Sequence, residues 1–200
     1  MIYLLRHGES TVNVEQRLTC KQFGGDLTEE GRKQARLAGN WLATKHITKV
    51  FVSPFHRAVQ TAKIIGELVN LEPEIRDDLR EMDCGELEGH TDAFAWERWR
   101  TTFDQWRRGE WEARFPGGES LREAFTRLAR ILHEATLTEN AVLVSHGGVT
   151  LSVVPYLCVN AAALQRVNAL ANTGMIVLEP YDMGRYACMS WDLVEHLQSH

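Results

Sequence analysis

Two short apolar segments of this chain both end at a histidine. The first covers residues 2–5 and leads through Arg6 into His7, and the second covers residues 141–145 and leads directly into His146. Both segments have the length and the β-branched or leucine-rich composition of a buried strand. In an open α/β sheet, ligands bind beyond the carboxyl ends of the strands. We therefore expect both imidazoles at one pocket, and the adjacent arginine suggests that the pocket takes an anion.

Segments of strand and helix character alternate along most of the chain. Capping residues followed by apolar stripes predict helices over residues 29–45, 54–69, 121–135 and 149–158. The second of these is expected to start at Pro54, with Ser53 as its cap. Further short apolar runs predict strands over residues 50–52, 74–76, 174–178 and 186–191. This order predicts an α/β fold whose mostly parallel sheet carries helices on both faces, with the last two strands as an antiparallel edge.

Length and composition narrow the class of protein. Two hundred residues fit a single domain over 1–200. The 22 basic and 27 acidic residues give no support to a nucleic-acid partner, and the lack of an apolar stretch of about 20 residues argues against a membrane span. The four cysteines are scattered without a Cys-x-x-Cys pair, which argues against zinc and favours reduced thiols in the cytoplasm.

An aromatic and charged stretch over residues 94–111 interrupts this pattern at near-helical spacing. It predicts a helical excursion at about 91–115. Aromatic side chains at this spacing more often pack in a core than bind a ligand. The functional alternative is a lid over the mouth of the pocket.

The residues at the predicted strand ends suit phosphoryl transfer. A neutral imidazole keeps one lone pair free, so His7 is the candidate nucleophile. Arg6, and Arg57 in the first turn of the second predicted helix, can bind phosphoryl oxygens, and His146 can donate a further hydrogen bond. The leaving alkoxide needs a proton, and Glu81, in a loop after a short strand, is the candidate acid.

Several motifs together give the chain a family resemblance. They are Leu5-Arg6-His7-Gly8-Glu9-Ser10-x-x-Asn13, Leu27-Thr28-x-x-Gly31-x-x-Gln34-Ala35, Ser53-Pro54-x-x-Arg57-Ala58-x-Gln60-Thr61-Ala62, Leu79-x-Glu81 with Gly85-Glu86-x-Glu88-Gly89, Pro116-Gly117-Gly118-Glu119-Ser120, and Ser145-His146-Gly147-Gly148. In this order they resemble the histidine phosphatase superfamily, in its phosphoglycerate-mutase-like branch. The match extends from residue 3 to about residue 150.

The resemblance implies a three-layer α/β/α sandwich and a role for each matching residue. His7 would be the phosphorylated histidine and Glu81 the proton donor. The residues implied to hold the phosphoryl group are Arg6, Asn13, Arg57, His146 and Gly147. The scheme needs no metal and no other cofactor, since arginines and histidines supply the positive charge.

Sequence details separate the subgroups of the family. Glu9-Ser10 after the first histidine differs from the Arg-x-Pro of the acid-phosphatase branch. Residues 107–110 do not match the Arg-Arg-Ser-Tyr-like segment of the cofactor-dependent mutases, so a phosphatase is favoured. Leu87 stands where a tryptophan is common, and residues 25–28 depart from the usual Asp-x-Pro-Leu-Thr. These departures leave the identity of the substrate open.

The expected function is hydrolysis of small phosphorylated metabolites by a cytoplasmic, metal-independent phosphomonoesterase. A cofactor-dependent phosphoglycerate mutase and a non-catalytic phospho-ligand binding module are the alternatives. A zinc hydrolase fails on the spacing of its ligands. The sequence leaves a homodimer open, and the remaining histidines are expected at the surface or in packing roles.

Overall fold

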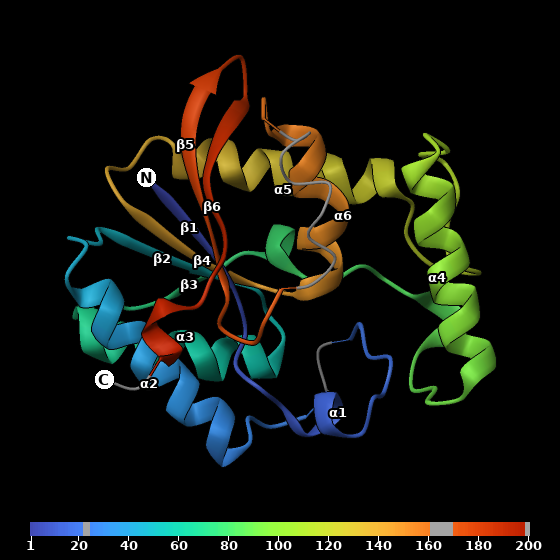
Figure 1. Cartoon of the computed structure of the whole chain (residues 1–200), viewed down its shortest axis with the longest axis horizontal. Helices are drawn as coiled ribbons and strands as arrows, with labels where there is room; N and C mark the ends of the chain where they lie inside the picture. Colours follow the sequence, from blue (N-terminus) through green and yellow to red (C-terminus); the bar gives the residue numbers. More distant parts are fainter. Residues whose placement is uncertain (22–24, 161–169, 199–200) are drawn as a thin grey trace.

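The computed structural model describes residues 1–21, 25–160 and 170–198 (Figure 1). Its strands are β1 Ile2–Arg6, β2 Lys49–Val52, β3 Glu74–Ile75, β4 Ala141–Ser145, β5 Met175–Asp182 and β6 Arg185–Leu193. Its α-helices are α1 Thr11–Val14, α2 Glu29–Ala43, α3 His56–Val69, α4 Ala93–Arg107, α5 Leu121–Ala135 and α6 Gly147–Leu157. Short 3-10 helices are η1 Asp77–Leu79, η2 Gly85–Leu87 and η3 Glu195–Leu197. Among the described helices, none has both the length and the apolar content to cross a membrane.

The strands form one mixed sheet in the order β3-β2-β4-β1-β5-β6. The four strands from β3 to β1 are parallel to their neighbours, while β5 runs antiparallel to β1 and β6 antiparallel to β5. The mostly parallel sheet and its antiparallel edge are therefore both confirmed. Since β1 and β4 are central, their carboxyl ends meet at the middle of one sheet edge.

Alternating side chains of the central strands build two separate cores. On β1, Ile2 and Leu4 belong to a cluster with the apolar faces of α5 and α6, while Tyr3 and Leu5 belong to a cluster with α2 and α3. Figure 1 shows these helix pairs on opposite faces of the sheet. Strands buried on both faces explain why the sequence shows continuous apolar runs instead of alternation.

Several predicted boundaries differ from the structure, three of them in the segments that follow β1, β2 and β4. α3 begins at His56 with Phe55 as N-cap, so the prediction that Ser53 caps a helix starting at Pro54 was wrong. The Ser53 hydroxyl instead accepts the Phe55 N–H and contacts His146. α6 begins at Gly147, two residues earlier than predicted, and residues 11–14 of the expected long loop form α1.

The aromatic stretch forms α4, and most of its rings are used in packing. Trp99 stacks on Phe115 with ring centroids 4.7 Å apart, and Trp106 is buried. Phe94, at the start of the helix, is 70% exposed. In Figure 1, α4 lies at the far side of the molecule from α2 and α3. The packing interpretation therefore describes most of this helix.

The turn that follows β1 is held against the start of α2. An added Cβ on Gly8 would lie 2.5 Å from the carbonyl oxygen of Gly31, and one on Gly31 would lie 1.9 Å from that of Glu9. Thr28 caps α2 and also donates its hydroxyl to the Glu9 carboxylate. Two glycines thus allow the chain to turn at His7 within contact distance of a helix.

We predict that Gly31→Ala destabilises the protein, although alanine is the better helix former by about 1 kcal/mol. The clash with the Glu9 carbonyl should cost about 1–3 kcal/mol of unfolding free energy. Urea unfolding measures this effect. The exposed Asn40→Ala on the same helix is the matched control and should not destabilise. Equal or higher stability of Gly31→Ala would contradict the close approach.

Candidate active site

The register of two parallel strands brings the two predicted histidines together. Arg6 of β1 pairs with Ser145 of β4. His7 follows Arg6 and His146 follows Ser145, so the two histidines are neighbours at the ends of these strands. Their ring centroids are 5.2 Å apart, and both side chains are buried. The two imidazoles thus lie next to each other, because adjacent parallel strands end side by side.

The hydrogen bonds of His7 fix its tautomer. Nδ1 lies 2.7 Å from the carbonyl oxygen of Gly8, which can only accept, so Nδ1 carries the proton. Nε2 therefore presents its lone pair, and it accepts a hydrogen bond of 3.0 Å from Nε of Arg57. Burial, with the charges of Arg57 and Arg6, lowers the pKa of His7 well below its usual value. The imidazole is therefore neutral and nucleophilic at neutral pH.

His146 is oriented from the neighbouring strand. Its Nε2 lies 2.7 Å from the hydroxyl of Ser53, the residue after β2. If that hydroxyl donates, Nδ1 of His146 carries a proton, and this buried atom has no hydrogen-bond partner among the described residues. Burial and the charge of Arg57 lower the pKa of His146 well below its usual value. A buried donor without a partner is costly unless a ligand supplies the acceptor.

Two arginines flank the histidine pair. Arg6 donates from Nη1 to the Leu170 carbonyl at 2.6 Å, while its buried Nε has no partner among the described residues. Arg57, in the first turn of α3, donates to His7 and to the Thr19 carbonyl. Burial lowers the pKa of both guanidinium groups, and the carboxylate of Glu81 opposes that shift. The electrostatic effect shows that Glu81 lies near both cations.

Glu81 lies at the N-terminus of α6. Its Oε2 accepts the N–H of Gly148 at 2.8 Å, and its Oε1 accepts those of Val149 and Met82. The free amides of a first helical turn favour a carboxylate at this place. Gly148 has no room for a side chain, since an added Cβ would lie 2.8 Å from Oε1 of Glu81. The start of α6 thus has His146 as its N-cap and binds the carboxylate of the candidate acid through its amides.

Asn13 and Gly147, the other two residues predicted to bind a phosphoryl group, lie around the histidine pair. Oδ1 of Asn13 accepts the N–H and hydroxyl of Ser10, which leaves its amide nitrogen without a hydrogen bond to the described residues. The amide of Gly147, the first residue of α6, has no partner within the helix. An added Cβ on Gly147 would lie 3.4 Å from Nε of Arg6. All seven predicted site residues therefore lie at one end of the sheet.

Two residues with a part in the site were not predicted as site residues. Asn172 donates from Nδ2 to the His7 carbonyl at 3.0 Å and to Oδ1 of Asn13 at 3.3 Å. Ser53 orients His146. No local pattern around Asn172 indicates a function, because it reaches the site from the segment before β5. Ser53 belongs to a quoted motif, but its sequence position suggested a helix cap.

The site opens into a cavity of about 740 Å³. The cavity begins at Arg6 and Asn13 and extends to Trp96 and Arg100 of α4. Its further lining residues are Glu9, Val12, Val14, Gln16, Arg17, Thr91, Ala93 and Asn172. α4 therefore combines a packed aromatic face with a contribution to the wall of the cavity.

The cysteines are not scattered, which corrects the expectation from their spacing. Sγ of Cys20, Sγ of Cys84 and a carboxylate oxygen of Glu88 lie within 4.8 Å of one another. Burial raises the pKa of the Cys20 thiol well above its usual value, so this thiol stays protonated. Glu88 accepts hydrogen bonds from the Cys20 amide at 2.7 Å and the Cys84 thiol at 3.4 Å. Two thiols and a carboxylate are ligand types suitable for zinc. Here, however, the carboxylate of Glu88 already accepts the protons of the Cys20 amide and the Cys84 thiol.

Comparisons of the sequence and the fold with known proteins identify the family of this chain. A family model described as "Histidine phosphatase superfamily (branch 1)" matches residues 2–193. This chain belongs to the histidine phosphatase superfamily. The prediction of a histidine-type phosphatase of α/β fold is thereby confirmed.

Relatives of this histidine phosphatase include proteins with both phosphatase and mutase names. A probable phosphoglycerate mutase from Enterobacter is 36% identical over 73% of this chain and 69% of its own length. Phosphoserine phosphatase 1 from Hydrogenobacter thermophilus is 32% identical over 72% of this chain and 70% of its own. The structure of mycobacterial glucosyl-3-phosphoglycerate phosphatase with VO3 has a TM-score of 0.82 at 26% identity, covering 96% of this chain and 98% of that one.

The two buried histidines predict how stability depends on pH. Both have a folded pKa below the unfolded value of about 6.5, so below pH 6.5 the unfolded chain binds protons that the folded chain does not. Unfolding free energy should therefore be highest above that pH and fall as pH decreases, by up to about 1.4 kcal/mol per pH unit for each group. The loss ends only when pH passes the folded pKa values.

Urea unfolding between pH 7 and pH 5 measures this slope. His146→Gln removes one of the two groups and should make the slope shallower. His133→Gln, on the exposed surface of α5, controls for the substitution itself. A slope that His146→Gln leaves unchanged would contradict the burial of a neutral imidazole at this position.

Proposed function

We propose that this phosphatase is a metal-independent phosphomonoesterase that acts through a phosphohistidine on His7. The observation that carries the proposal is a pair of buried donors, Nε of Arg6 and Nδ1 of His146, without partners among the described residues. Both belong to residues next to a neutral imidazole whose tautomer leaves Nε2 unprotonated. A phosphoryl group at Nε2 would supply the acceptors that both donors lack.

In the first step, Nε2 of His7 attacks phosphorus and the bond from phosphorus to the ester oxygen breaks. The guanidinium groups of Arg6 and Arg57 and the imidazole of His146 neutralise charge on the phosphoryl oxygens. With the anionic ester bound beside it, Glu81 takes up a proton from solvent, and its carboxyl group gives that proton to the leaving alkoxide, so the product is a neutral alcohol. The amides of Asn13 and Gly147 add donors to the same oxygens.

In the second step, water attacks the phosphohistidine. The carboxylate of Glu81 accepts the proton of that water, the bond from phosphorus to Nε2 breaks, and inorganic phosphate forms. His7 and Glu81 then return to their starting protonation states. The guanidinium groups of Arg6 and Arg57 supply the positive charge for both steps, and the scheme therefore includes no metal.

The cavity outside the phosphoryl site favours a substrate that carries another acidic group. Arg17 and Arg100 line it, together with the indole of Trp96 and the carboxylate of Glu9. Phosphoserine and phosphoglycerate, named in two relatives, both carry a carboxylate beside the phosphate. We propose that α4 acts as a lid segment of one domain over residues 1–200, and that the enzyme works on small cytoplasmic metabolites.

His7→Ala is expected to abolish hydrolysis of 4-nitrophenyl phosphate, since no other described group offers a lone pair at that point. EDTA should leave the parent enzyme active. Protein quenched in alkali, where the P–N bond of a phosphohistidine survives, should carry a phosphoryl group in the parent chain and none in the variant, as measured by intact mass under non-acidic conditions. Full activity of the variant, or its loss with EDTA in the parent chain, would refute the mechanism.

Arg100→Ala is expected to raise KM for O-phosphoserine roughly 5-fold while leaving KM for O-phosphoethanolamine nearly unchanged, because only the first substrate has a carboxylate for the guanidinium. Arg107→Ala is the matched control, since Arg107 lies on the same helix, is 64% exposed and does not line the cavity. Equal changes for both substrates would remove Arg100 from the substrate site.

A phosphoglycerate mutase is the second candidate, because a relative with 36% identity has that probable name. A mutase returns the phosphoryl group of the histidine to a bound phosphoglycerate instead of to water. Incubation of 3-phosphoglycerate with a bisphosphoglycerate primer distinguishes the two activities. Isomerisation without phosphate release would establish the mutase, whereas phosphate release supports the phosphatase. Tight phosphate binding without either reaction would favour the non-catalytic binding module.

A further inference from the structure

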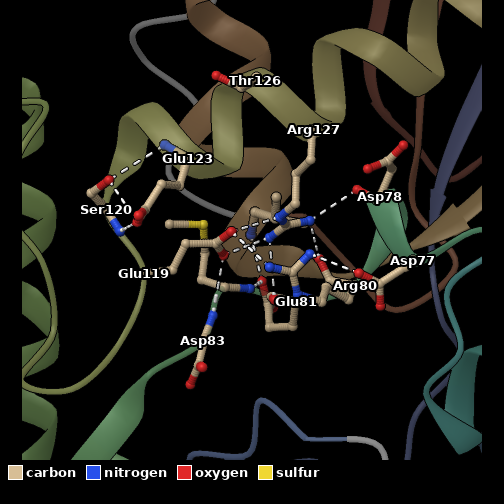
Figure 2. Close-up of polar contacts among 12 residues, drawn as sticks. Asp77, Asp78, Arg80, Glu81, Asp83, Glu119, Ser120, Glu123, Thr126 and Arg127 are labelled. Carbon is tan, nitrogen blue, oxygen red and sulfur yellow. Dashed lines mark hydrogen bonds and ion pairs between the residues drawn. The ribbon is translucent and has the colours of Figure 1, made fainter.

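A buried ion pair lies directly beneath the segment that carries Glu81. Arg127 of α5 is 4% exposed, and Glu119, just before that helix, is 6% exposed. Their contact is bidentate, with Nε to Oε1 and Nη2 to Oε2 both at 2.8 Å. Figure 2 shows the pair between α5 and the chain around Glu81. This planar geometry is available to arginine and not to lysine.

The remaining donors of Arg127 bind the main chain of this segment. Nη1 donates to the carbonyl oxygens of Asp78 at 2.9 Å and Arg80 at 2.7 Å, and Nη2 donates to that of Glu81 at 3.2 Å (Figure 2). A guanidinium has five N–H groups, and these contacts together with the ion pair use all five. Arg127 thus holds three carbonyl groups within four consecutive residues.

Glu119 holds the chain on the other side of Glu81. Its Oε2 accepts the N–H of Asp83 at 3.3 Å, and its own N–H donates to the Asp83 carbonyl at 2.8 Å. Its Oε1 also accepts from Nη2 of Arg80 at 3.1 Å. The pair therefore fixes the main chain on both flanks of the proposed acid, while the acid's carboxylate is bound to the start of α6.

Stability alone does not account for this arrangement. Apolar residues of similar volume often replace a buried ion pair without loss of stability. What apolar residues cannot do is donate to three carbonyl groups and so select one path for residues 78–81. The position of an acid relative to the leaving oxygen must hold to within a fraction of an ångström, since a shift of about 1 Å can lower a rate about 100-fold.

We propose that Arg127 and Glu119 form a positioning device that sets Glu81 for proton transfer to the leaving group. The inference rests on the proposed function, in which Glu81 is that proton donor. Neither residue touches the substrate. Both act by fixing the main chain from which the acid side chain extends.

The test separates proton donation from the rest of catalysis through the leaving group. Glycerol 2-phosphate releases a strongly basic alkoxide that needs the acid, whereas 4-nitrophenyl phosphate releases a weakly basic phenolate that scarcely does. We expect Arg127→Lys to lower kcat for glycerol 2-phosphate roughly 10- to 100-fold and to change that for 4-nitrophenyl phosphate less than about 3-fold. KM for both esters should change little.

Three further variants complete the experiment. Glu81→Gln provides the reference for loss of the acid, and Glu81→Gln with Arg127→Lys should show the same ratio of the two rates as Glu81→Gln alone. Glu119→Gln perturbs the pair from its other member and replaces Arg127→Lys if that protein does not fold. Arg130→Lys is the matched control. Arg130 lies on the same helix, and its guanidinium binds the carboxylate of Asp78 at the exposed surface and not the main chain.

The outcomes are distinct. Equal losses with both esters in Arg127→Lys and Glu119→Gln, or an unchanged ratio of rates, would overturn the positioning role while leaving the proposed function standing. An unchanged ratio in Glu81→Gln would remove Glu81 as the acid and the inference with it. If the parent chain hydrolyses neither ester, the proposed function fails. Circular dichroism at the assay temperature shows whether each variant is folded.

Discussion

Parallel pairing of β1 with β4 is the constraint on which the rest of the site depends. The pairing aligns Arg6 with Ser145, and the two histidines that follow are therefore neighbours although they are far apart along the chain. Burial of both strand faces keeps water away from the imidazoles, and this burial is also the first cause of their lowered pKa values. The same pairing that completes the core thus makes the nucleophile neutral.

The proposed nucleophile, His7, and the proposed acid, Glu81, are held by different layers of the protein. The turn at His7 is fixed against α2 by the close approach of Gly8 and Gly31. Glu81 is fixed against α5 and α6, on the other face of the sheet, through the Arg127–Glu119 pair and the amides of α6. In the proposed mechanism, the phosphoryl group of the substrate lies between these two supports.

Much of this arrangement could be predicted from the sequence, because it rests on local patterns. The apolar runs and the capping residues predicted the sheet and the helix starts at residues 29 and 121, and the family resemblance of the motifs implied the seven candidate site residues. Contacts that no strand-end pattern or motif indicates could not be predicted in this way. Asn172 reaches His7 from another segment, Ser53 turned out to contact His146, and the pairing of Cys20 with Cys84 depends on how two loops fold together.

The hydrogen bond from Arg57 to His7 has a consequence for the resting enzyme. The Nε2 lone pair, which attacks phosphorus in the proposed mechanism, accepts the Nε proton of the guanidinium when no substrate is bound. An incoming electrophile without negatively charged oxygens offers Arg57 no competing acceptor. The guanidinium then keeps its hydrogen bond to Nε2 of His7, and the lone pair stays unavailable. A phosphate ester offers the guanidinium a stronger acceptor and uncovers the nitrogen as it arrives. The reactivity of His7 therefore depends on the charge of the molecule that enters the pocket.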